Sequence, residues 1–249
     1  MGRGFGSTDG AGTTDKIVTN YTACHTLSTW SVQFWLTGAG GGGLGRLFDK
    51  DGTTTGERVL LYDDAAGQLR FSVAWTVPNT WHITAPATGM WHHLCVTYDG
   101  SSTTNDPVFY LNGTTPAVTD EAGPSGTLQT NTGAYHVGNR SNDVRNLNGR
   151  LAHPAHWDRI LSASEALALS NGISPSYFRN NLKFHYPLIG RYSPEYDDVA
   201  GAVGTVTGTA VQPHPRIFNP WKPVGVSVDP ASLSAVPVFM RHYAARRSL

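Results

Sequence analysis

The chain has 249 residues, no formal net charge with neutral histidines, and only 14% charged residues. This composition excludes a basic nucleic-acid surface and an acidic disordered tail, because both need an excess of one charge. Hydrophobic residues make up 39% of the chain and include seven tryptophans, enough for a substantial core. No apolar run approaches the roughly 20 residues that span a bilayer. Residues 1–16 contain no apolar h-region, so we expect no secretory signal.

Short strand-like segments follow one another along the first two thirds of the chain. Each is rich in β-branched and aromatic residues and is bounded by Gly, Asn, Asp or Pro. Regularly spaced short strands are typical of a sandwich or jelly roll rather than an α/β fold. The predicted strands are 15–20, 29–36, 45–50, 57–63, 67–75, 91–99, 107–113, 134–139 and 149–160.

One helix is predicted in the segment ILSASEALALSNG. Ser162 is the expected N-cap, and Glu165 three residues later completes a capping box. Gly172 stands where a helix commonly ends with a left-handed residue. The segment 182–188 (LKFHYPL) then predicts a late strand that returns to the sheet.

From about Thr209 the chain becomes rich in proline. Proline lacks the backbone donor that a central strand needs, so we predict an extended arm over 209–249 after a single domain over 1–208. Apolar residues in the arm are spaced like anchors, and its end is basic, which favours docking onto a neighbouring protein. The residues predicted to dock are Phe218, Trp221, Phe239, Arg241, Arg246 and Arg247.

Adjacent histidines in the stretch MWHHLCVTYDG suggest a metal or catalytic site. In a strand, however, successive side chains point to opposite faces, so His92 and His93 cannot hold one metal ion together. The same alternation separates His153 from His156 in a regular strand. No Cys/His cluster has zinc spacing, so we expect these histidines to be structural and predict no metal site among them.

Signals for catalysis are missing from the sequence. There is no G-x-S-x-G motif for a serine nucleophile. Glycosidic cleavage needs two carboxylates flanking one bond, and none of the four glutamates has a second acid two residues away within a predicted strand. We therefore predict that the chain is not an enzyme and needs no cofactor.

Two weaker signals for ligands stay open. Asp49 with Asp51, and the pair Asp63–Asp64, place oxygen ligands in loops where calcium could bind, although ordinary turns use the same residues. Trp75 and Trp81 flank VPNT and could form an aromatic platform for a sugar ring, although burial in a sheet is the commoner role.

The cysteines are Cys24 and Cys95 alone, so at most one disulfide could form. Without an export signal we expect two reduced thiols, with a disulfide as the alternative.

The order of several motifs resembles a known family. WSVQFWL, FDKDG, GQLRFSV, MWHHLCVTYDG, VFYLNG, YHVGN and GRLAHPAHWDRILSASEALAL follow one another as in laminin-G-like domains of the concanavalin-A-like lectin/glucanase superfamily. The resemblance covers roughly residues 14–190. It implies an all-β fold: a two-sheet antiparallel jelly-roll sandwich with one short helix, followed here by the extended C-terminal arm. The E-x-D-x-x-E strand of the glucanase members is absent, and function on such a scaffold depends on the individual site.

The amino-terminal sequence, MGRGFGSTDGAGTTDKIVT, resembles that of laminin-G-like proteins of tailed bacteriophages. That resemblance implies a non-enzymatic structural or decoration protein of a virion, made in the host cytoplasm. Its partners would be capsid or tail subunits docked through the arm, or further copies of the chain. The alternative is a carbohydrate-binding adhesion module that recognises host or environmental glycans.

Overall fold

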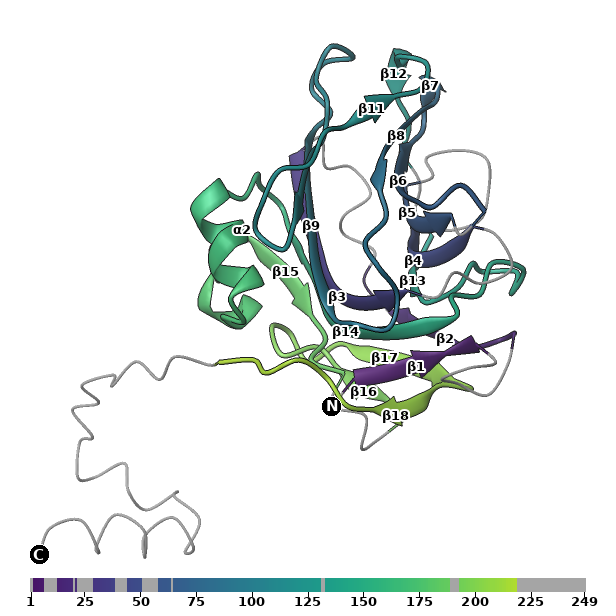
Figure 1. Ribbon diagram of the computed structural model, residues 1–249, viewed down its shortest axis with the longest axis vertical. Helices are drawn as coiled ribbons and strands as arrows, with labels where there is room; N and C mark the ends of the chain where they lie inside the picture. The colour runs from purple at the N-terminus through teal and green to yellow at the C-terminus, as the bar shows by residue number, and fades with distance from the viewer. Residues whose placement is uncertain are drawn as a thin grey trace, which may run out of the picture. The chain divides into compact units, whose positions relative to one another are not determined.

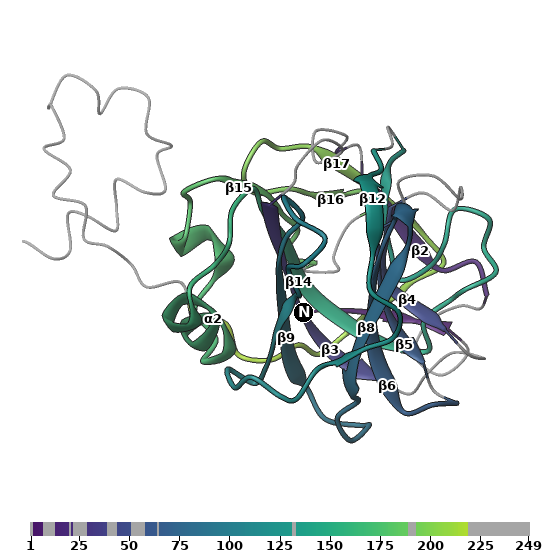
Figure 2. The same ribbon diagram turned by 90° about the horizontal axis from the view of Figure 1, so that it is seen from above.

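The fold consists of two large sheets packed face to face. In the computed structural model, every pair of neighbouring strands is antiparallel, as the jelly-roll prediction requires. Figures 1 and 2 show the two sheets facing each other, with the helix on the outer side of one of them. The structure describes residues 2–6, 13–19, 21, 29–38, 44–50, 58–63, 65–130, 133–188 and 193–218.

The first sheet has seven strands and the second has nine. In the first, spatial order is β10 (Val108–Leu111), β9 (His92–Asp99), β3 (Thr29–Gly38), β14 (Gly149–Trp157), β1 (Gly2–Phe5) and β18 (Ala210–Gln212), with β15 (Leu182–His185) also paired to β14. In the second, it is β11 (Thr119–Asp120), β8 (Asn79–Thr84), β6 (Gln68–Val73), β5 (Arg58–Asp63), β4 (Gly45–Lys50), β13 (Tyr135–Val137), β2 (Lys16–Thr19), β17 (Val203–Thr207) and β16 (Glu195–Tyr196). A small separate sheet pairs β12 (Ser125–Leu128) with β7 (Trp75–Val77).

Each segment predicted as a strand contains one in the structure, including the late segment at 182–188. Strands β1, β8, β11, β12, β16, β17 and β18 were not predicted. Most of them are short or rich in glycine, which weakens the alternation that marks a strand. Strand β8 is the important omission, because it carries Trp81.

The core lies between the two sheets. Alternation in β6 turns Phe71 inward, where its ring stacks on Trp81 of β8 with centroids 6.2 Å apart. Tyr98 of β9 meets both rings from the opposite sheet, 5.7 Å from Phe71 and 5.4 Å from Trp81. Burying three aromatic side chains together contributes several kcal/mol to folding, at roughly 2 kcal/mol or more for each large side chain.

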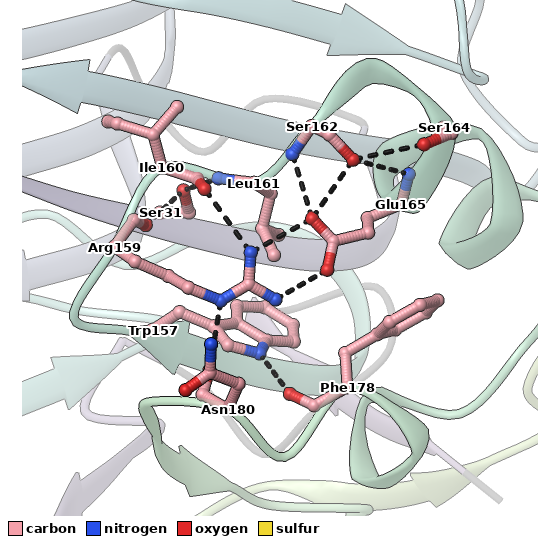
Figure 3. Close-up of polar contacts among 10 residues, drawn as sticks. All are labelled: Ser31, Trp157, Arg159, Ile160, Leu161, Ser162, Ser164, Glu165, Phe178 and Asn180. Carbon is pink, nitrogen blue, oxygen red and sulfur yellow. Dashed lines mark hydrogen bonds and ion pairs between the residues drawn. The ribbon is translucent and has the colours of Figure 1, made fainter.

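Helix α2 (Ala163–Ser170) covers part of the outer face of the seven-stranded sheet. Its predicted capping box is present: the Ser162 hydroxyl accepts from the Glu165 amide, and the Glu165 carboxylate accepts from the Ser162 amide (Figure 3). The guanidinium of Arg159 holds the same carboxylate through Nη1 and Nη2 at 2.9 and 2.5 Å. Asn171 ends the helix, and Gly172 follows with a φ of 87°, as predicted.

A second apolar cluster lies beneath α2, where Ala166 and Leu169 pack towards Trp157 of β14 and Cys95 of β9. Cys95 is free and fully buried, and burial, followed by the nearby charge of Glu165, raises the pKa of its thiol. Cys95 forms no disulfide within the described residues, and the reduced state of the two thiols stays a prediction. Cys24 lies outside the described residues.

A buried ion pair connects the two sheets at their far ends. Arg3 of β1 donates from Nε to Glu195 Oε1 of β16 at 2.9 Å, and both side chains are at most 6% exposed. Removing one partner of such a pair leaves an uncompensated buried charge, which typically costs about 3–5 kcal/mol.

The last described residues pack on the sandwich. Strand β18 pairs with β1, and Phe218 forms a bridge with Ile173 just after α2. The division at 208/209 stays a prediction, because the arm beyond Phe218 lies outside the described residues. None of the helices in the described ranges is long and apolar enough to cross a membrane.

Candidate functional site

The two tryptophans predicted to form a sugar platform lie in the core. Trp75 is 6% exposed, and Trp81 is fully buried. Their indole N–H groups donate to Tyr98 Oη at 2.9 Å and to Asp106 Oδ1 at 2.8 Å, respectively. A sugar platform needs an open ring face. The structure gives neither ring that exposure, so we leave both residues out of the candidate site.

Phe218 is the one predicted docking residue within the described ranges. Its amide donates to Gly172 O at 2.6 Å, and its carbonyl accepts from the Ser174 amide at 2.9 Å. Its backbone is therefore fixed to its own domain, while its side chain is 45% exposed. The other predicted docking residues lie outside the described ranges: Trp221, Phe239, Arg241, Arg246 and Arg247.

The predicted calcium ligands do not converge. Asp49 is buried and accepts from Arg46 Nε at 2.8 Å. Asp63 accepts from the Ala66 amide at 3.2 Å and lies 3.3 Å from Arg70 Nε. Within the described residues, no group of three or more His, Cys, Asp or Glu side chains could hold a metal ion. The remaining predicted ligands lie outside those residues: Asp51 and Asp64.

His92 and His93 hold a hairpin together. His92 donates from Nε2 to Ala87 O at 2.9 Å and accepts at Nδ1 from the Asn112 side-chain amide at 3.1 Å. The Asn112 carbonyl oxygen accepts from the His93 amide at 2.9 Å. Burial lowers the pKa of His93 to about 3, so its ring is neutral against Trp35. The two rings serve the fold, as predicted.

A second group of histidines was not anticipated. His153 lies at a bulge of β14 with a φ of 52°, and its ring stacks on His185 of β15 with centroids 5.2 Å apart. His153 Nδ1 is 3.0 Å from His185 Nε2, and His185 Nδ1 donates to Asp198 Oδ2 at 2.9 Å. His214 approaches His153 edge-on at 5.4 Å, and Ser176 Oγ lies 3.0 Å from His185 Nδ1.

These residues include a serine, a histidine and an aspartate, but they do not form a nucleophilic triad. In a triad the serine and the carboxylate contact opposite nitrogens of the imidazole. Here Ser176 and Asp198 share Nδ1 of His185, and His153 occupies Nε2. The Ser176 hydroxyl also donates to Asp198. His185 therefore does not stand between the serine and the carboxylate as the general base of a triad.

A network of polar side chains on the outer face of the nine-stranded sheet is the best candidate for ligand binding. Because Phe71 and Trp81 point inward, their neighbours Arg70 and His82 point outward, and the two are paired across β6 and β8. Arg70 donates from Nε to Gln68 at 2.8 Å and lies 3.0 Å from Glu121 through Nη2. We call these side chains, with Asp63 of β5, the outer network: Asp63, Gln68, Arg70, His82 and Glu121.

Backbone bonds hold Glu121 in place. Its amide donates to Thr80 O at 3.1 Å, at the end of β11. Beside it, Asp120 accepts at Oδ1 from Asn79 Nδ2 at 2.6 Å and from the Ala122 amide at 3.2 Å. The hydrogen bond from Asn79 is the main reason that the pKa of Asp120 is lowered, so this carboxylate is ionised at neutral pH. The loop is therefore organised before any ligand arrives.

The outer network retains unused polar groups. Among the described residues, Arg70 Nη1 and Glu121 Oε2 make no hydrogen bond, and their side chains are 26% and 33% exposed. A donor and an acceptor fixed side by side can bind a ligand that carries neighbouring hydroxyl groups, each of which both donates and accepts.

Of the outer network, only Asp63 was predicted from the sequence, as a candidate calcium ligand. The polar alternation Gln68–Arg70–Ser72 in β6 was available as a signal, and so was Thr80–His82–Thr84 in β8. Neither pattern says which residue of another strand lies opposite. Glu121 is 51 positions from Arg70 by residue number, and only the sheet register brings them together.

The sequence and the fold were compared with known proteins. Residues 10–166 match the family model Laminin_G_3, described as the concanavalin A-like lectin/glucanases superfamily. No curated protein matches the sequence.

Several solved structures share the fold. A putative carbohydrate binding protein from Bacteroides ovatus aligns at a TM-score of 0.63 with 16% identity, over 88% of this chain and 61% of that one. The chain thus spans about three fifths of that protein. The CBM40 of the Ruminococcus gnavus IT-sialidase, bound to α2,3-sialyllactose, aligns at 0.51 with 14% identity, over 66% and 97%. A heptameric SAP-like pentraxin from Limulus polyphemus aligns at 0.54 with 15% identity, over 83% and 94%.

Proposed function

The chain belongs to the concanavalin A-like lectin/glucanases superfamily, and from this premise we propose that it is a carbohydrate-binding domain whose ligand contacts the outer network. The similar folds of a putative carbohydrate binding protein and of a sialyllactose-bound module support a glycan ligand rather than a purely structural role. At their low identities they do not identify binding residues, so the site is argued from the residues of this chain.

One observation carries the proposal: among the residues that the structure describes, Arg70 Nη1 and Glu121 Oε2 are an unused donor and an unused acceptor beside the 3.0 Å ion pair of the same side chains. Their positions are fixed by β6 and by the backbone of the β8–β11 pair. Polar groups that are already ordered lose little conformational entropy when a ligand binds. Sugars offer neighbouring hydroxyls at a spacing that suits such a pair.

Binding to a panel of immobilised oligosaccharides tests this proposal. We expect the protein to retain at least one glycan, and Arg70→Ala and Glu121→Ala to weaken retention about tenfold or more, since each removes a charge-assisted hydrogen bond. Arg179→Ala and Asp158→Ala are matched controls, because these charged residues lie away from the outer network, near the seven-stranded sheet. A folded protein that retains no glycan, or that binds equally well without Arg70 and Glu121, would contradict the proposal.

Docking of the arm onto virion subunits is a separate proposal. It is supported by the spacing of apolar residues beyond 212 and by the exposed side chain of Phe218, at the end of the described residues. Deleting 219–249 leaves β18 and the Phe218 backbone bonds in place, so the shortened domain should fold. If the arm docks, this deletion abolishes incorporation into particles, and normal incorporation would contradict it.

A further inference from the structure

The charges around Arg70 restrict the class of glycan that the outer network can bind. Its guanidinium lies 3.3 Å from Asp63 and 3.0 Å from Glu121. These two carboxylates against one guanidinium leave a net charge of −1 on the three side chains. The positive group in this network is thus already neutralised before a ligand arrives.

From this arrangement, and resting on the proposed function, we propose that the outer network selects glycans that carry a protonated amine over neutral glycans and rejects acidic ones. The expected ligand class is an amino sugar with a free amine next to a hydroxyl. A carboxylate-bearing sugar would have to approach Arg70 between Asp63 and Glu121, where like charges repel it.

Glu121 is the group that would receive the amine. Its Oε1 takes both the contact from Arg70 and the hydrogen bond from His82 Nδ1, at 3.0 and 3.2 Å. A carboxylate only accepts, so His82 Nδ1 carries the hydrogen of that bond. Oε2 is left for an external donor, and an ammonium group provides three N–H bonds for this purpose.

Arg70 would supply the second contact. With Nε and Nη2 engaged by Gln68, Asp63 and Glu121, the remaining nitrogen Nη1 can donate to a hydroxyl oxygen beside the amine. Arg70 would then bind the hydroxyl group of the sugar, and Glu121 would bind its ammonium group. An N-acetylated sugar keeps the hydroxyl contact but loses the ammonium group.

The alternative is that the outer network stabilises the fold and binds no ligand. Exposed ion pairs of this kind stabilise a fold by about 0–1 kcal/mol. A purely structural role would change the melting temperature in variants without changing the order of ligand affinities, so selectivity is the measurement that separates the two roles.

The test compares three oligosaccharides of equal length by titration calorimetry at pH 6.5 on the full chain: glucosamine, N-acetylglucosamine and galacturonate oligomers. We expect the glucosamine oligomer to bind about tenfold more tightly than its acetylated counterpart, the difference made by one charge-assisted hydrogen bond. The galacturonate oligomer should show no binding. Higher salt should reduce the difference, because exposed charges are screened.

Two variants sharpen the comparison. Glu121→Gln keeps an acceptor but removes the charge, so the preference for the amine should disappear. Asp158→Asn, near the other sheet, should change nothing. An equal affinity for the amine and acetylated oligomers, or tighter binding of galacturonate, overturns this inference while leaving glycan binding intact. If no oligosaccharide binds the folded protein, the proposed function itself fails.

Discussion

His153 and His185 form a stacked pair in which Nδ1 of the first lies 3.0 Å from Nε2 of the second. His185 uses its Nδ1 hydrogen for Asp198, so its Nε2 is an acceptor and the hydrogen of the shared bond belongs to His153. Burial is the largest cause that lowers the pKa of His153 to about 3. His153 is therefore neutral in the folded protein at neutral pH.

Acid should therefore destabilise the fold well above the pH at which carboxylates titrate. Burial lowers the pKa of His93, His153 and His156 to about 3, from 6.5 in the unfolded chain. The unfolded state binds more protons than the folded state below pH 6.5, so stability is present above that pH and is lost as the pH falls towards 3. At pH 5 each histidine costs about 2 kcal/mol.

Urea unfolding at pH 7.5 and pH 5 measures this effect. We expect a loss of about 6 kcal/mol from the three histidines together, a large part of the stability of a typical domain. His156→Phe keeps the edge contacts with Tyr135 and Phe184 and should reduce the proton uptake on unfolding by about one. An unfolding free energy that is the same at both pH values would contradict the prediction.

Removing the cap of α2 should destabilise the domain by a modest amount. Ser162→Ala loses the hydroxyl that accepts from the Glu165 amide, and N-cap losses of this kind cost about 1 kcal/mol. Glu165→Ala should cost at least as much, because it removes the second half of the capping box and the partner of Arg159 (Figure 3). Glu165→Gln should cost less, since glutamine can still accept from the Ser162 amide. The order of the three melting temperatures checks this.

Hydrogen bonds from Arg159, followed by those from Ser162, lower the pKa of Glu165 to about 2 although partial burial opposes them. Glu165→Gln should therefore remove a contribution that is present above pH 4.5 and is lost as the pH falls towards 2. If the melting temperatures of wild type and Glu165→Gln differ equally at pH 7 and pH 2.5, this part of the prediction is wrong.

Trp81→Ala should act on the core rather than on ligand affinity. The side chain is fully buried and stacks on Phe71, and a Trp-to-Ala change in a core costs about 3–5 kcal/mol. Trp81→Phe should recover most of the packing but lose the hydrogen bond to Asp106. Guanidinium unfolding gives the cost, and glycan titration at a temperature where the variant is folded should show unchanged affinity. If Trp81→Ala instead lost glycan binding while keeping normal stability, Trp81 would have to be counted among the ligand-binding residues.

Local patterns predicted the fold well, and long-range pairing explains what they missed. Strand alternation places His92 and His93 on opposite faces, and helix spacing places Glu165 opposite its cap Ser162. Each of these features depends on a single short segment, and the structure confirms both. Strand β8, which carries Trp81, was missed because Pro78 interrupts the strand pattern before it. The Arg70–Glu121 pair depends on the order β11–β8–β6, which no single segment specifies.

Gly172 should tolerate no side chain, for two separable reasons. Its φ of 87° disfavours any L-residue, and a Cβ there would lie 2.6 Å from Arg216 O. Gly201 has a φ of 69° with nothing within 4 Å of its Cβ position, so it is the matched control for the backbone strain alone. Gly201→Ala should cost about 1–2 kcal/mol, and Gly172→Ala should cost more because the segment 216–218 must also move.

Hydrogen exchange identifies where the extra cost falls. The Phe218 amide donates to Gly172 O, and the Ser174 amide donates to Phe218 O. Displacing residues 216–218 breaks both bonds, so both amides should exchange faster in Gly172→Ala and at the wild-type rate in Gly201→Ala. Equal stability losses and unchanged exchange in both variants would mean that the segment is not held by this contact.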